Sequence, residues 1–140
     1  MKTKFTPLVK LNKQQADEVE QALQKNAQEI VLKQEEIDAL VREFATLQEP
    51  KSGIYQAFLT FAEHKRYYRT SIDEKAYELA LLKQKRGELQ ELFRQKNIEY
   101  EKAKYLENLE IKKVLEKIKK QEAKDLDEIS VMLYNQKVVE

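Results

Sequence analysis

A single interruption, Glu49-Pro50-Lys51-Ser52-Gly53, separates two long stretches of heptad-repeating sequence and constrains the fold more than any other feature. Pro50 cannot continue a helix and pushes Glu49 away from helical angles, while Gly53 accepts a positive φ. The expected helices cover residues 7–48 and 54–135, with a turn at 49–53. Because a short connection between amphipathic helices favours antiparallel packing, we expect one all-α domain, residues 1–140, folded as an antiparallel two-helix coiled-coil hairpin with a longer second helix.

The first expected helix carries an apolar residue at every seventh position: Val9, Ala16, Leu23, Ile30, Ile37 and Phe44. Such a strict repeat predicts a coiled-coil seam. The companion seam positions are mixed, and Asn26 and Lys33 stand among apolar residues there. Polar seam residues cost stability but can fix the register of the two helices; a loosely packed stretch is the alternative, and both interpretations stay open.

The second expected helix continues the alternating spacing of four and three residues over the positions Ile54, Phe58, Phe61, Lys65, Tyr68, Ile72, Lys75, Leu79, Leu82, Arg86, Leu89, Phe93, Lys96, Tyr100 and Ala103. Lys and Arg fit such a seam because their aliphatic stems cover it while their charged ends reach water. Ser71 opens a sequence typical of a helix start, but the heptad phase continues past it, which favours one unbroken helix. A turn at 50–53 would place Val9 near Phe93.

The two helices differ in length, so part of the second has no partner in its own chain. At ~1.5 Å per residue they measure roughly 63 and 120 Å, and roughly 60 Å of the second helix is left over. Beyond Ala103 the apolar pattern changes phase and continues through Leu106, Leu109, Ile111, Leu115, Ile118, Leu126, Ile129 and Leu133. An unpaired apolar stripe predicts an external partner.

Composition argues against an enzyme. The chain is 36% charged, with two Gly, two Pro, no Cys and one His, so it has no thiolate or His-cluster metal site, no Ser-His-Asp arrangement and no phosphate-binding loop. We therefore expect neither catalysis nor a cofactor. The basic and aromatic segment 64–69 is too short, on a chain of net charge +1, to predict nucleic-acid binding. No apolar run is long enough for a signal peptide or a membrane span, so we expect a cytoplasmic protein without direct membrane insertion.

We call the part of the second expected helix that has no partner in its own chain the surplus. Two segments in it resemble the FliJ family of flagellar type III export proteins. Lys104-Tyr105-Leu106-Glu107-Asn108-Leu109 is similar to the family's K-x-L-E-x-L element, and residues 122–130 are similar to its closing E-x-K-x-x-D-E-[IF]-[AS] element. The chain length and the order of a helix, a short break and a longer helix also agree. The early turn and Ala62, where the family tends to carry a larger aliphatic residue, depart from the pattern.

The resemblance implies a non-enzymatic hairpin similar to the central stalk of rotary ATPases, located in the cytoplasm at the inner-membrane export apparatus. It implies as partners the hexameric export ATPase FliI, the export-gate protein FlhA and export chaperones. Carried over to this chain, it implies an ATPase contact at Lys104, Leu106, Glu107, Leu109, Lys124, Asp127, Glu128 and Ile129. It also implies an export-gate contact at Tyr55, Phe58 and Phe61.

Two alternatives stay open on the sequence alone. The surplus of the second helix could pair with a second copy of the chain, which would make the protein a homodimeric scaffold or tether. The chain could also be the equivalent stalk protein of a virulence type III secretion system. The identity of the cargoes and chaperones does not follow from these residues.

Overall fold

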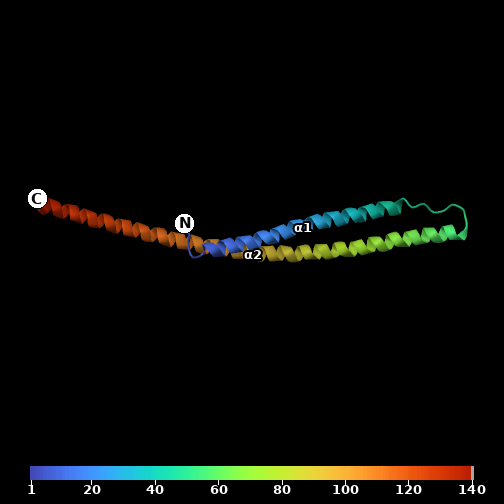
Figure 1. Ribbon diagram of the computed structural model, residues 1–140, viewed down its shortest axis with the longest axis horizontal. Helices are drawn as coiled ribbons and strands as arrows, with labels where there is room; N and C mark the ends of the chain where they lie inside the picture. The colour runs from blue at the N-terminus through green and yellow to red at the C-terminus, as the bar shows by residue number, and fades with distance from the viewer. Residues whose placement is uncertain (140) are drawn as a thin grey trace. The chain divides into compact units, whose positions relative to one another are not determined.

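The computed structural model describes the backbone of residues 1–139 and the side chains of residues 1–137. It contains two helices, α1 (Thr6–Ala45) and α2 (Tyr55–Val139), joined by residues 46–54 (Figure 1). No strand occurs within residues 1–139. The expected all-α hairpin with a longer second helix is confirmed, and α2 passes Ser71 without a break. The bounds differ from expectation, because α1 ends before residue 48 and α2 continues past residue 135.

Local hydrogen bonds explain where α1 begins and ends. The Thr6 hydroxyl accepts a hydrogen bond from the Thr3 amide at 2.9 Å, and the first helical bond runs from the Val9 amide to the Phe5 carbonyl. At the other end the amides of Thr46 and Leu47 donate to the carbonyls of Glu43 and Phe44, three residues back, so the last turn tightens and the helix ends there. The Thr46 hydroxyl also donates to the Glu43 carbonyl at 2.7 Å. Gly53 then takes a φ of 147°, a conformation that favours glycine over residues with a Cβ.

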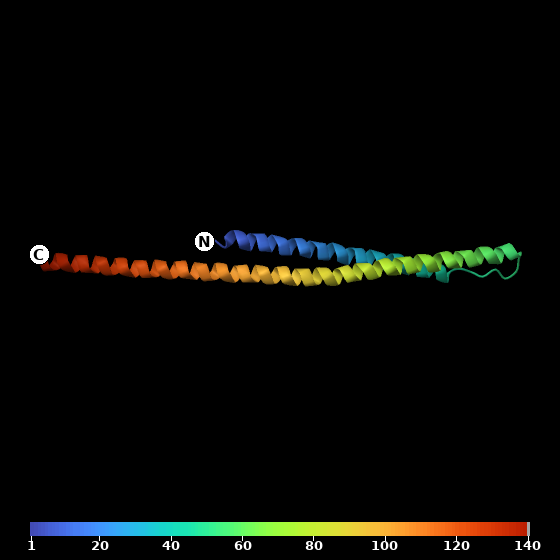
Figure 2. The same cartoon turned by 90° about the horizontal axis from the view of Figure 1, so that it is seen from below.

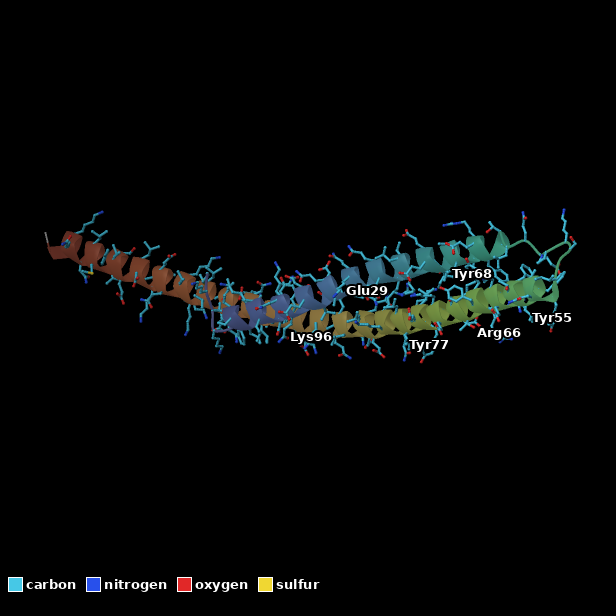
Figure 3. The ribbon with its side chains drawn as sticks, turned by 45° about the vertical axis from the view of Figure 1, so that its right-hand side comes forward. Glu29, Tyr55, Arg66, Tyr68, Tyr77 and Lys96 are labelled. Carbon is cyan, nitrogen blue, oxygen red and sulfur yellow. The ribbon has the colours of Figure 1, made fainter. Side chains whose placement is uncertain are left out.

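The chain forms two compact units. The first joins residues 17–95, and the second joins residues 1–16 with α2 from Lys96 onward. Within the first unit, Asn26 contacts Leu82 and Phe44 packs edge-on against Tyr68, so the helices run antiparallel. Figure 3 shows Tyr68 directed toward α1 while Tyr77 and Arg66 lie on the outer side of α2.

The predicted seam of α1 is confirmed, since every one of its apolar heptad positions from Val9 to Phe44 is buried or half-buried. On α2 the same holds for the predicted positions from Phe61 to Ala103, with the exception of Arg86. Ile54 and Phe58 are exposed, so their assignment to the seam is wrong. Ala16, Leu79 and Ala103 are the apolar residues most completely enclosed among the described side chains.

The expected register, with Val9 near Phe93, is wrong. In the unit that contains both chain ends, the Asn12 amide nitrogen donates to the Glu99 carbonyl at 3.3 Å. The expected register would have placed Asn12 opposite Gln90. The physical reason is the connection, which spans residues 46–54 instead of 49–53. This longer connection allows the first turns of α2 to extend beyond the C-terminal end of α1, with no part of α1 opposite them. The pairing of α1 therefore moves toward the C-terminus of α2, and the unpaired surplus of α2 starts later than expected.

Polar residues in the seam make defined contacts across it. The Asn26 side chain is 2% exposed and donates from Nδ2 to the Leu82 carbonyl at 3.1 Å. Its Oδ1 atom is buried without a partner among the described residues. The bond supports the interpretation of Asn26 as a residue that fixes register, because an alignment that removed it would leave the buried Nδ2 donor unpaired as well.

About two helical turns further along α1, Lys33 joins a four-membered charge cluster. Its Nζ atom lies 2.7 Å from Glu78 and 3.2 Å from Glu36, and Lys75 lies 3.5 Å from Glu36 and 3.8 Å from Glu78. The hydrogen bond from Lys33 lowers the pKa of both carboxyl groups, and the bond to Glu78 raises the pKa of Lys33. The contacts of Lys33 with Glu78 and of Lys75 with Glu36 join the two helices, so they support the register that the structure shows.

We expect this charge cluster to make stability depend on pH in the acid range. Because Glu36 and Glu78 have a pKa below 4.5 in the folded chain, their contribution is complete above pH 4.5 and is lost as the pH falls through their lowered pKa values. Urea midpoints of the wild type and of Glu36→Gln/Glu78→Gln, measured from about pH 6 to about pH 3, should therefore converge on acidification. A gap between them that stays constant would contradict the assignment.

Candidate partner-binding surfaces

The functional residues expected from the sequence all lie on α2, in two separate regions. One region comprises the C-terminal part of α2 from Lys104 onward, and the other comprises its first turns from Tyr55. Within residues 1–139, no three His, Asp or Glu side chains are placed to hold a metal ion. In the described part of the chain neither helix has an apolar stretch long enough to cross a bilayer.

The first motif, residues 104–109, lies where α1 still packs against α2. Lys104 reaches back one turn, with Nζ 3.2 Å from Glu101 and 4.7 Å from the centre of the Tyr100 ring. Glu107 is half-buried, and its Oε2 is enclosed without a hydrogen-bond partner among the described residues. Leu106 and Leu109 are exposed instead. The motif therefore has a side that packs within the chain and a side open to solvent.

The open side of this motif is larger than the sequence motif suggests. Ile98, Tyr105 and Leu106 line a shallow groove on α2, with Asn97, Glu101 and Lys102 as its polar rim. Ile98 and Tyr105 were not among the expected contact residues. The signal that could have found them is their spacing of seven residues on positions that the heptad seam does not use.

The second motif is fully open to solvent. Lys124, Asp127, Glu128 and Ile129 are all exposed, and the Ile129 side chain is 52% exposed. Figure 2 shows the C-terminal part of α2 continuing past the N-terminus of α1. About 20 residues separate the centres of the two motifs, which corresponds to roughly 30 Å along a helix. The structure therefore does not bring the eight expected ATPase-contact residues into one patch.

The first turns of α2 form a second exposed apolar surface. Tyr55 is 78% exposed, and Ile54, Phe58 and Leu59 are exposed beside it. Phe61 differs, because it is half-buried and the Lys65 ammonium lies 5.0 Å from the centre of its ring. This surface exists because α1 ends at Ala45, where Phe44 already packs on Tyr68, so the preceding turns of α2 have no helix opposite them. Figure 3 marks Tyr55 next to the connection.

The basic and aromatic segment 64–69 is divided between the two sides of α2. Lys65 and Tyr68 are half-buried toward α1, and burial raises the pKa of the Tyr68 phenol, with a further contribution from Glu43. Arg66 and Tyr67 are exposed, and the Arg69 guanidinium lies 5.9 Å from the centre of the Phe44 ring. Because its aromatic and basic members point in different directions, the segment presents no continuous basic face.

Comparison with curated proteins and with solved structures gives no match. The sequence model of the family described as flagellar FliJ protein matches residues 1–138, which is nearly the whole chain. The match covers both helices, the connection, and both motifs of α2, residues 104–109 and 122–130. The chain therefore belongs to the FliJ family of the flagellar export apparatus.

Proposed function

We propose that this protein is a non-enzymatic stalk of the flagellar type III export apparatus, which docks on the hexameric export ATPase FliI and couples it to the export-gate protein FlhA and to export chaperones. The match to flagellar FliJ proteins over residues 1–138 carries the proposal and favours a flagellar over a virulence secretion system. The proposed location is the cytoplasmic side of the inner-membrane export apparatus.

The unpaired surface of α2 supports the proposed ATPase contact. From about residue 112 onward the described side chains of α2 are mostly exposed, and Leu115, Ile118 and Ile129 are among the large apolar residues left open. A helix that buries one face against a partner typically has such an apolar stripe with charged flanks. Asp127 and Glu128, within one turn of Ile129, and Lys124, about a turn and a half before it, supply charged flanks.

We expect a chain that ends at Lys113 to lose association with FliI. It keeps α1 and the part of α2 that pairs with it, so far-UV circular dichroism should still report a helical protein. Affinity capture with purified FliI tests the association, and a chain that ends at Leu133 is the matched control that should still bind. Capture of FliI by the chain that ends at Lys113 would contradict the proposal that FliI binds the C-terminal region of α2.

The exposed surface at the start of α2 supports the proposed export-gate contact. We expect the double substitution Tyr55→Ala/Phe58→Ala to weaken binding to the cytoplasmic part of FlhA by tenfold or more, since exposed aromatic residues often dominate an interface (about 2 kcal/mol each). Binding isotherms and motility on soft agar measure the effect. Tyr67→Ala, which removes an exposed aromatic residue of the same helix, should change neither. Unchanged FlhA affinity in the double variant would show that the contact lies elsewhere.

A further inference from the structure

A symmetric apolar stripe runs along the C-terminal part of α2. Its members are Ile111, Leu115, Ile118, Leu126, Ile129 and Leu133, with Glu122 at the midpoint. Ile118 and Leu126 lie four residues from Glu122, Leu115 and Ile129 lie seven, and Ile111 and Leu133 lie eleven. At ~100° per residue all seven positions fall within an arc of roughly 80°. The stripe is thus a single face that reads the same in both chain directions.

The stripe follows an eleven-residue repeat and not the heptads of the hairpin. Ile111, Glu122 and Leu133 are successive equivalents in this repeat. Eleven residues in three turns give ~3.67 residues per turn, close to the ~3.6 of an α-helix, so the stripe winds only slowly around the helix and in the opposite sense to a heptad stripe. A partner that covers it must present an apolar face that winds in the same way.

In the part of the chain that the structure describes, most of the stripe is open to solvent, and only Ile111 at its start is half-buried. Leu115, Ile118, Leu126, Ile129 and Leu133 are all exposed, between 44% and 64%. Within the same unit, the hydrogen bond between Asn12 and Glu99 places the first turns of α1 before the stripe along α2. Large aliphatic side chains exposed together on one helical face mark an interaction surface.

The charges along the stripe have opposite sign on the two sides of its midpoint. Five lysines, with Glu116 as the exception, precede it: Lys112, Lys113, Lys117, Lys119 and Lys120. Asp125, Asp127 and Glu128 follow it, with Lys124 as the exception. In an antiparallel pair of such helices the basic half of each lies along the acidic half of the other, whereas a parallel pair would align like charges.

We infer that the stripe binds the same stripe of a second copy of this chain, antiparallel, with Glu122 at the two-fold axis. Ile111 then packs near Leu133 of the second copy, Leu115 near its Ile129, and Ile118 near its Leu126. The symmetric spacing is compatible with a two-fold interface, in which each contact occurs twice, and the order of the charges favours a second copy as the partner. This pairing goes beyond the proposed function. Because it buries Leu115, Ile118 and Ile129, which the proposed FliI contact also uses, a given chain can take part in only one of the two assemblies at a time.

Cysteine cross-linking tests the pairing directly, because the native chain has no cysteine. Glu122→Cys should form a disulfide-linked dimer of the full chain on mild oxidation, because the two copies of residue 122 meet at the axis. Leu115→Cys alone should not, but an equal mixture of Leu115→Cys and Ile129→Cys should form a linked heterodimer. Cross-linking of Leu115→Cys with itself as efficiently as Glu122→Cys would indicate a parallel dimer and overturn the inference.

Charge reversal tests whether the charge order selects the partner. Sedimentation equilibrium of the full chain at about 50 μM should show dimer, as expected for micromolar self-association. Lys117→Glu/Lys119→Glu and Asp125→Lys/Asp127→Lys should each weaken self-association by about tenfold, and an equal mixture of the two should restore it. All four positions are exposed, and circular dichroism checks that the variants stay helical. A monomeric wild type, or reversals without effect on the dimer, would overturn the inference.

Discussion

Replacement of Leu79 by alanine will lower the free energy of unfolding by about 2–3 kcal/mol, the lower part of the range for large-to-small changes in a core. Leu79 is 8% exposed and is the most enclosed large aliphatic side chain among the described residues. A seam formed by only two helices has no second layer of side chains to fill the space that the alanine leaves. Urea denaturation followed by far-UV circular dichroism measures the effect.

Leu81→Ala is the matched control for this prediction. It makes the same chemical change two residues away on the same helix, but Leu81 is 47% exposed. Since leucine and alanine have similar helix propensities, the control separates packing across the seam from the stability of α2 itself. We expect a loss below about 1 kcal/mol, because little apolar area is removed from a buried environment. Equal losses in the two variants would show that the seam does not hold residues 17–95 together.

The sequence predicted the fold well because a coiled coil is encoded by periodicity. The heptad positions of α1 and the positions from Phe61 to Ala103 on α2 are enclosed in the structure, apart from Arg86. The phase continuity across Ser71 was sufficient to predict one unbroken helix, which α2 confirms. Hydrophobic period alone therefore identified which face of each helix packs.

The register could not be predicted in the same way, because heptad stripes can slide along each other and remain apolar. It depends on the length of the connection, and Thr46 ends α1 before the Pro50 signal is reached. It also depends on polar partners across the seam: the structure gives Lys33 the carboxylate of Glu78. The expected register would have placed Lys33 opposite Tyr68 and Arg69.

For the candidate partner-binding surfaces, too, the sequence motifs could be predicted, whereas the exposure of their side chains could not, because exposure depends on how α1 and α2 pair. The motifs at residues 104–109 and 122–130 were recognisable from the sequence, as were Tyr55 and Phe58, but the exposure of these residues depends on where α1 begins and ends. Glu107 is half-buried because α1 pairs further along α2 than expected. Tyr55 and Phe58 are open because α1 ends before it reaches them. A register error of about nine residues, roughly 14 Å along the helix, is enough to change which side chains a partner can reach.

Asn26→Leu should stabilise the hairpin, by about 1–3 kcal/mol, and at the same time reduce the uniqueness of its register. The side chain is 2% exposed and makes one hydrogen bond, from Nδ2 to the Leu82 carbonyl, while Oδ1 has no partner among the described residues. Leucine removes the unsatisfied oxygen and adds apolar contact. The Leu82 carbonyl still accepts the backbone hydrogen bond of α2 in the variant, so the loss of the Asn26 bond lowers the free energy of unfolding only slightly.

Thermal unfolding and amide NMR spectra together test both halves of this expectation. The variant should unfold at a higher temperature, and its spectrum should contain additional sets of peaks from residues 17–95 because other registers are no longer penalised by a buried amide. Asn12→Leu is the matched control: Asn12 also donates across the seam, to Glu99, but is only half-buried, so its replacement should change both measurements less. A less stable Asn26→Leu variant would mean that the carboxamide contributes net stability. A single set of peaks would mean that the charge cluster around Lys33 and the connection fix the register without Asn26. Asn26 would then be a residue that the seam tolerates but does not need.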